Sequence, residues 1–227
     1  MRVTVFGANG ATGRLLCRQL LDQGHGVVAV TRRPDSFPVD GAEVVQADAT
    51  DPAAVTRAVQ GADAVLSVLG TPFTRQPITL YSTAGREIVA AMQVAGVRRL
   101  AVVTSSAAVR LPQPAGGLLL THVLEPLVTR TVGRTTYQDM RRLEKLVTES
   151  GLDWVVLRPS GLFDHPEVTA YELADDHAPA PFTARADLAA ALVQTLTDDS
   201  LLRRAWAVST TQVRQSLLRL VLRESAA

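Results

Sequence analysis

Short apolar runs rich in β-branched residues alternate along this chain with segments of helical periodicity. The runs lie at residues 3–6, 27–30, 43–46, 64–70, 100–105 and 154–159. The helical segments between them end at glycines, which commonly follow the last turn of a helix: Gly24, Gly61, Gly96 and Gly151. Parallel strands need crossover connections, and helical crossovers cover both faces of a sheet. The pattern therefore predicts a doubly wound α/β fold around a parallel sheet.

The length of the chain favours one domain over residues 1–227, because 47% of its residues are hydrophobic and can fill a single large core. Periodicity weakens after Pro159, and we expect residues 160–183 to form part of a small cap on the substrate side. A helix, the strand AWAVST and a last helix near residues 211–224 are expected to follow. Residues 72–81 and 110–133, rich in Pro, Gly and Thr, are expected to flank a site as loops or short helices.

Composition argues against several classes of protein. The formal net charge is +1, and no basic run is interleaved with aromatic residues, so we expect no nucleic-acid partner. No apolar stretch is long enough to cross a membrane, and Met1 leads into a strand-like run, so a cytoplasmic protein is expected. Cys17 is the single cysteine, and the four histidines lack metal-ligand spacing, so we expect neither a disulfide nor a metal site.

Gly7, Gly10 and Gly13 lie three residues apart where the first predicted strand passes into a helix. In a dinucleotide fingerprint, such glycines form a tight turn, let the backbone approach a pyrophosphate, and bring the helix close to the sheet. The helix N-terminus adds free N–H groups for the anion. A glycine-rich turn can also occur without a ligand, but a second predicted strand about twenty residues on favours the fingerprint. The spacing excludes a P-loop.

The second predicted strand ends in Thr31-Arg32-Arg33, where an NAD-binding protein would usually carry an acidic residue for the ribose hydroxyls. A guanidinium group suits a 2′-phosphate and gives a bare hydroxyl little reason to bind. The sequence therefore predicts NADP(H) rather than NAD(H). The alternative interpretation is that Arg32 and Arg33 are only solvated surface residues.

The segments GANGATG, VTRRP, QADATD, VLSVLG, VVTSSAAV, ESGLDWVVLRPSGL and TARADLAAAL occur in this order. Over most of residues 1–200 the chain resembles the atypical branch of the short-chain dehydrogenase/reductase superfamily, in the group similar to flavin/biliverdin reductases and NmrA-like proteins. The resemblance implies a Rossmann fold. It implies that the pyrophosphate is bound by Gly7, Asn9, Gly10, Ala11, Thr12 and Gly13. It also implies that Arg32 and Arg33 bind the 2′-phosphate, that Asp48 and Ala49 bind the adenine, and that Val68, Leu69 and Gly70 lie along the ribose side of the nicotinamide.

Typical members of this superfamily use a Ser-Tyr-Lys set in which the tyrosine stands four residues before the lysine, and this set is incomplete here. Lys145 is the only lysine and lies two helical turns beyond Tyr137, whereas Arg141 occupies the lysine position. Arginine stays protonated and cannot relay a proton. Ser106 falls where the family keeps a substrate-polarising hydroxyl. Ser106 and Tyr137 are therefore the candidate catalytic residues, with local hydrogen bonding and packing as the alternatives.

The leading hypothesis is an NADPH-dependent reductase that transfers hydride to a small apolar or aromatic carbonyl, quinone or flavin-like substrate, as a monomer or homodimer. A hydroxyl such as that of Ser106, or a water molecule, would supply the proton. Glu144 is expected to be a salt-bridge or capping partner, and Arg158 to shape the floor of the site. The alternatives are a non-catalytic NADP(H) sensor of the NmrA-like kind and an epimerase or dehydratase that retains its cofactor.

Overall fold

The computed structural model describes residues 1–74, 76–109, 111 and 133–213. Its centre is an 8-stranded sheet with the order β3-β2-β1-β4-β5-β6-β10-β8. The strands are β1 (Arg2–Phe6), β2 (Gly26–Thr31), β3 (Glu43–Gln46), β4 (Ala64–Ser67), β5 (Arg99–Val103), β6 (Asp153–Pro159), β8 (Tyr171–Ala174) and β10 (Arg204–Thr210). Each apolar run predicted to be a strand forms one, although β4 ends at Ser67 and not at Gly70, and β5 ends at Val103 and not at residue 105.

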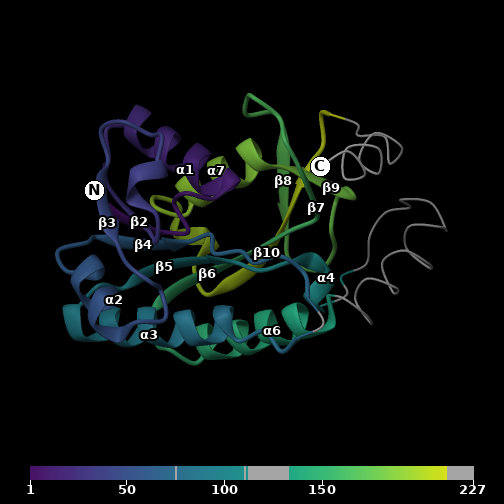
Figure 1. The fold of residues 1–227 in the computed structure, drawn as a ribbon. Coiled ribbons are helices and arrows are strands. Elements are labelled where there is room, and N and C mark those ends of the chain that lie inside the picture. Colours follow the sequence, from purple (N-terminus) through teal and green to yellow (C-terminus); the bar gives the residue numbers. More distant parts are fainter. Residues whose placement is uncertain (75, 110, 112–132, 214–227) are drawn as a thin grey trace.

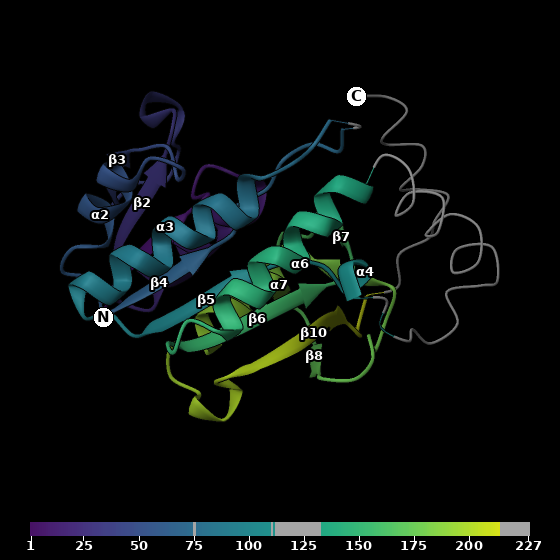
Figure 2. The same cartoon turned by 90° about the horizontal axis from the view of Figure 1, so that it is seen from below.

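Helices cover both faces of the sheet, as expected for a doubly wound fold (Figure 1). One face carries α1 (Ala11–Asp22) and α7 (Arg185–Gln194), which pack against each other. The other face carries α2 (Pro52–Val59), α3 (Leu80–Ala95) and α6 (Arg134–Thr148), and Figure 2 shows α3 and α6 lying side by side. Shorter helical segments are η1 (Pro34–Ser36), α4 (Ser106–Val109) and η3 (Asp199–Leu201).

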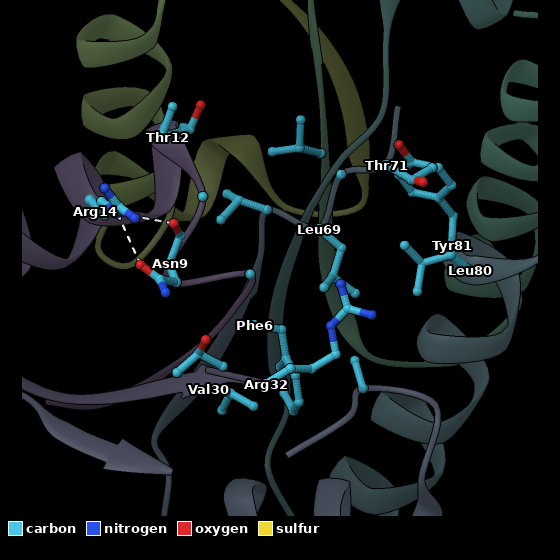
Figure 3. A pocket seen from close by; sticks show the side chains of 18 of the residues that line it. Phe6, Asn9, Thr12, Arg14, Val30, Arg32, Leu69, Thr71, Leu80 and Tyr81 are labelled. Carbon is cyan, nitrogen blue, oxygen red and sulfur yellow. Dashed lines mark hydrogen bonds between the residues drawn. The ribbon is translucent and has the colours of Figure 1, made fainter. Parts of the chain in front are cut away.

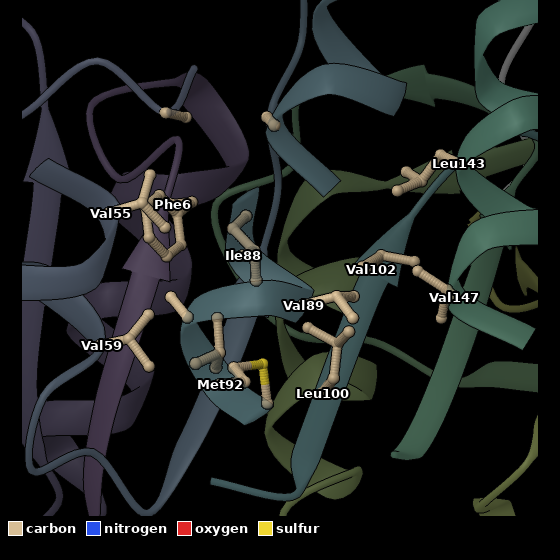
Figure 4. Close-up of a cluster of buried hydrophobic side chains, with 14 of the residues drawn as sticks. Phe6, Val55, Val59, Ile88, Val89, Met92, Leu100, Val102, Leu143 and Val147 are labelled. Carbon is tan, nitrogen blue, oxygen red and sulfur yellow. The ribbon is translucent and has the colours of Figure 1, made fainter. Parts of the chain in front are cut away.

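Two hydrophobic cores lie on the two sides of the sheet. Figure 4 shows the core beneath α2, α3 and α6, where Phe6, Ile88 and Met92 are at most 1% exposed. The second core, which contains Leu16 and Leu192, joins α1 and α7 to the opposite face. Because both faces are covered, the central strands are mostly apolar on both sides. Thr4 in β1 is a polar exception, and its buried hydroxyl donates to the Ala58 carbonyl at 2.9 Å.

The strands pair in parallel from β3 to β10, but the edge strand β8 is antiparallel to β10. Residues 160–183, expected in a cap, therefore contribute one strand to the main sheet. They also form β7 (Gly161–Phe163) and most of β9 (Phe182–Ala184), which pair as a separate two-stranded sheet. No helix lies between β6 and β8, a stretch that the structure describes in full, so the alternation of strands and helices in the sequence gave no sign of β8.

Residues 72–74 and 76–79 form neither helix nor strand, as expected for a loop, and Leu80 then begins α3. The loop or short helix expected at residues 110–133 and the helix expected near residues 211–224 fall almost wholly outside the described residues. Of the helices that the structure describes, none is both long and apolar enough to span a bilayer.

Candidate functional site

A cavity of about 1080 Å³ lies at the carboxyl ends of the strands, where the strand order changes direction between β1 and β4. Figure 3 shows side chains from both halves of the sheet facing it. Open α/β sheets bind ligands in the crevice at such a switch point. The topology therefore places this cavity where a dinucleotide would bind.

The glycine-rich turn forms one wall of the cavity. Gly7 has a φ of 80°, and a Cβ atom there would lie 2.7 Å from the carbonyl oxygen of Val68. A Cβ atom on Gly13 would lie 2.2 Å from the carbonyl oxygen of Gly7, so helix α1 can start this close to the turn only with glycine. Gly10 is the N-cap of α1, without a capping side chain or an acidic residue in the first turn. The first N–H groups of α1 are thus available to an anion.

Asn9 ties this turn to the segment that follows β2. Its side-chain amide donates to the Ser36 hydroxyl at 2.9 Å and to the Arg33 carbonyl at 3.3 Å. Arg14 Nε in turn donates to the backbone and side-chain oxygens of Asn9, both at 3.0 Å. Asn9, Arg14, Arg33 and Ser36 all line the cavity, together with Arg32. This end of the cavity is therefore cationic and braced by hydrogen bonds.

Asp48 and Ala49 line the same end, next to Thr50. The Thr50 hydroxyl and backbone N–H donate to Asp48 Oδ1 at 2.7 and 2.9 Å. These bonds lower the pKa of Asp48 below its usual value, and the Arg32 charge adds to the effect. Asp48 is therefore ionised at neutral pH and can accept hydrogen bonds from a ligand.

The opposite end of the cavity is mostly apolar. Its walls come from the loop after β4, the start of α3, the end of β5, α6, β7 and α7. The lining residues there include Leu69, Thr71, Pro72, Leu80, Tyr81, Val103, Thr104, Met140, Leu162 and Leu188. Such a surface suits an apolar ligand with a few oriented polar groups.

A buried ion pair lies behind this apolar end. The Thr104 hydroxyl donates to Glu144 Oε1 at 2.6 Å. Arg158 donates to the same carboxylate through Nε at 3.1 Å and Nη2 at 2.6 Å. Glu144 is thus the salt-bridge partner expected from the sequence, and its carboxylate is bonded on both oxygens.

Ser106 and Tyr137, the candidate catalytic residues, are not among the described residues that line the cavity. Ser106 begins α4 and is 2% exposed, whereas Tyr137 lies on α6 with its ring centroid 5.7 Å from that of Phe73. Arg141 donates to the carbonyl of Ala108 at 2.7 Å and so anchors α4. Lys145 points to solvent, with its side chain 76% exposed. The described residues therefore do not assemble a Ser-Tyr-Lys arrangement.

A family model described as NAD(P)H-binding matches residues 7–199. The chain belongs to this NAD(P)H-binding family. An uncharacterised protein from Mycobacterium tuberculosis is 33% identical over 164 residues, which cover 72% of this chain but only 15% of that protein. The (4-alkanoyl-5-oxo-2,5-dihydrofuran-3-yl)methyl phosphate reductase of Streptomyces griseus is 31% identical over 91% of this chain and 67% of its own length.

A solved short-chain dehydrogenase/reductase from Veillonella parvula, in complex with NADP, has a TM-score of 0.75 and 20% identity, covering 94% of this chain and 96% of its own. This likeness confirms the Rossmann fold inferred from the sequence, and the family model confirms that the chain is of an NAD(P)H-binding family. NAD(P)H is the cofactor of the family, in agreement with the NADP(H) expected from the sequence.

The cavity fits such a cofactor. Gly7 and Gly13 let the turn pack tightly on its neighbours, and Gly10, Ala11 and Thr12 at the uncapped start of α1 line the cavity. Every residue implied as a cofactor ligand lines the cavity except Gly13, which packs on Gly7. No group of three or more His, Cys, Asp or Glu residues that could hold a metal occurs in the part of the chain that the structure describes.

Several lining residues were missed by sequence reasoning, among them Arg14, Ser36, Thr71, Tyr81, Thr104, Met140, Leu162, Arg185 and Leu188. Residues 72–81 were expected to flank a site. Tyr81 lies in this stretch and Thr71 lies next to it, so the sequence did indicate that both could be near the site. For Met140 and Leu188 the sequence gave no such indication. Helix periodicity shows that these side chains face inward, but it does not distinguish a position in the core from one beside a cavity.

Proposed function

We propose that this protein is an NADPH-dependent reductase acting on a small apolar or aromatic carbonyl, quinone or flavin-like substrate. One observation carries the proposal: a single cavity has a cationic end beside a glycine turn and an apolar end on the other half of the sheet. In this arrangement a dinucleotide binds across the two halves of the sheet, with its adenosine at the cationic end of the cavity. The substrate then occupies the apolar end.

The residues at the cationic end favour NADPH over NADH. Arg32 and Arg33 supply guanidinium groups for a 2′-phosphate, and Asn9 holds the backbone of Arg33 in place. Gly10, Ala11 and Thr12 offer the N-terminus of α1 to the pyrophosphate. Together these groups would bind the phosphates of the cofactor by charge and by oriented N–H donors.

At the apolar end the chain orients the reactants and excludes water. The bound cofactor supplies a hydride from its nicotinamide ring. Leu80, Leu162 and Leu188 supply apolar walls at this end of the cavity. Holding two reactants in register removes a large entropic part of the barrier, so positioning alone contributes to the rate. A hydroxyl or a water molecule would supply the proton. The sequence offers Ser106 and Tyr137 for this role, but neither is among the described residues that line the cavity.

The relatives support a reductase. The Streptomyces griseus protein is named for reduction of a furanone carrying a phosphate, and it is similar to this chain over 91% of the chain's length. The mycobacterial relative, of which this chain spans 15%, carries no assigned activity. Substrate class must therefore be measured on this chain itself.

The experiment is a spectrophotometric assay of NADPH oxidation by the purified chain with diacetyl, menadione and FMN as acceptors. The proposal expects turnover of at least one acceptor, and a slower rate with NADH. A matched control is the variant Gly7→Ala, which places a Cβ atom against the turn and should lose cofactor binding. Tight NADPH binding with no oxidation in any assay would contradict the reductase.

A second candidate is a non-catalytic NADP(H) sensor. The observation that favours it is the exposed position of Lys145, the chain's only lysine, away from Tyr137 and paired with Glu149 at 4.0 Å. A sensor would bind NADPH and NADP⁺ with different affinities, or change its oligomeric state with the redox state of the cofactor. Size-exclusion chromatography with light scattering, with each form added, distinguishes this candidate from the reductase.

A further inference from the structure

Tyr81 is the tyrosine that faces the apolar end of the cavity. It lies in the first turn of α3, is 4% exposed, and lines the cavity beside Leu80 and Thr71. Figure 3 shows its ring extending from the start of α3 toward Thr71, across the cavity from Asn9 and Arg14. The phenol is therefore in the half of the site that the adenosine end does not occupy.

The backbone around Tyr81 is held by a buried carboxylate. Asp139 on α6 is 0% exposed, and its Oδ2 accepts the N–H groups of Tyr81 at 2.8 Å and Ser82 at 3.2 Å. The Ser82 hydroxyl donates to the other oxygen of the same carboxylate. Since the carboxylate fixes the first turn of α3 against α6, the Tyr81 ring has a defined position, as a group that acts on a ligand requires.

Three other hydroxyl groups are less suited to give a proton to a ligand in the cavity. Thr104 lines the cavity, but its hydrogen is already donated to Glu144. Ser106 and Tyr137 do not belong to the described lining. Burial raises the pKa of Tyr81 above its usual value, more than the nearby Thr71 backbone lowers it. The Tyr81 phenol is therefore protonated throughout the physiological range.

We propose that Tyr81 is the proton donor of the reductase, taking the role that the incomplete Ser-Tyr-Lys set cannot fill. The proposal rests on the proposed function. In the reaction, a carbonyl carbon of the substrate accepts hydride from NADPH, and the electron pair of the C=O bond moves onto oxygen. That oxygen takes the phenol proton, and the resulting phenolate takes a proton from water. The products are an alcohol and NADP⁺.

Fluorine NMR tests whether Tyr81 faces the reacting end without relying on turnover. The chain has only three tyrosines, so protein labelled with meta-fluorotyrosine gives few resonances, which Tyr81→Phe and Tyr171→Phe assign. NADP⁺ should shift the Tyr81 resonance and leave that of Tyr171, which hydrogen-bonds Gln194, unchanged. Binding of NADP⁺ without a shift at Tyr81 would overturn this proposal and leave the proposed function intact.

The second arm measures reduction of diacetyl by NADPH. Tyr81→Phe should lower kcat by about 100-fold, the usual scale of a lost general acid, with the Kd for NADPH within about twofold of the wild type. Tyr171→Phe is the matched control and should keep full activity. An unchanged kcat in Tyr81→Phe would refute the assignment of Tyr81 as the proton donor but not the reductase. Absence of NADPH binding or of diacetyl reduction by the wild type would refute the reductase as well.

Discussion

Arg158 and Glu144 form a two-point ion pair under the apolar end of the cavity, with Nη2 2.6 Å from Oε2 and Nε 3.1 Å from Oε1. Their side chains are 16% and 10% exposed. The pair joins β6 to α6 and, through the Thr104 hydroxyl, to the end of β5. It therefore holds together the elements that shape the floor of the site.

Removing one partner of this ion pair should destabilise the folded state. We expect Glu144→Gln to lower the free energy of unfolding by about 2 kcal/mol, somewhat below the range for fully buried pairs because Arg158 keeps some solvent contact. The neighbouring Lys145–Glu149 pair is the control, since its side chains are 76% and 67% exposed. Lys145→Ala should change the free energy by about 0.5 kcal/mol or less. Urea unfolding measures both, and equal effects would contradict the assignment.

Two glycines with nearly the same φ should respond differently to alanine. A Cβ atom on Gly7 (φ 80°) would lie 2.7 Å from the carbonyl oxygen of Val68, whereas one on Gly24 (φ 77°) would meet no atom within 4 Å. Gly24→Ala should cost about 1 kcal/mol, from the left-handed backbone alone. Gly7→Ala should cost more and abolish NADPH binding, because the turn must shift. Thermal unfolding and fluorescence of bound NADPH test this, and the same loss in both variants would refute it.

Removal of the positive charges that follow β2 should weaken the binding of NADPH but not that of NADH. We expect Arg32→Ala and Arg33→Ala each to raise the Kd for NADPH by about tenfold, the scale of a lost charge-assisted hydrogen bond, with little change for NADH. Arg18→Ala is the control, because Arg18 is exposed on α1 and is not among the lining residues. Equal weakening of both nucleotides would argue that these arginines act on structure and not on the 2′-phosphate.

Cys17 should be inert in the folded chain. It is fully buried on α1, and burial raises the pKa of its thiol from 9.0 to about 12. Because the folded value is raised, this group favours the folded state fully below the unfolded pKa and loses that contribution as pH rises from about 9 toward 12. A thiol reagent such as DTNB should label it near pH 8 only after denaturant is added. Rapid labelling without denaturant would contradict this.

Much of the site could be predicted because its signals are local in sequence. Gly7, Gly10 and Gly13 are spaced for a strand-to-helix turn, and the structure shows backbone contacts that require glycine at Gly7 and Gly13. Arg32 and Arg33 follow directly after a recognisable strand, so their place at the switch point follows from topology. The strands were predicted for the same reason, since apolar runs flanked by glycines need no tertiary information.

Other features depend on contacts between distant segments. Tyr81 faces the cavity because Asp139, far along the chain, anchors the start of α3. Pairing of β8 with β10 depends on a register that the sequence pattern does not encode. The sequence places Arg141 four residues after Tyr137, but the hydrogen bond from Arg141 to the Ala108 carbonyl depends on where α4 packs. In each case tertiary placement decides between interpretations that are equivalent locally.

Isothermal titration of NADPH and NADH into the full chain tests the central claim most directly. The claim is that the cavity binds a dinucleotide, with two arginines recognising its 2′-phosphate. It predicts binding of both nucleotides at one site, with NADPH tighter by about tenfold or more. Absence of binding to either nucleotide, or binding of NADH at least as tight as that of NADPH, would contradict it.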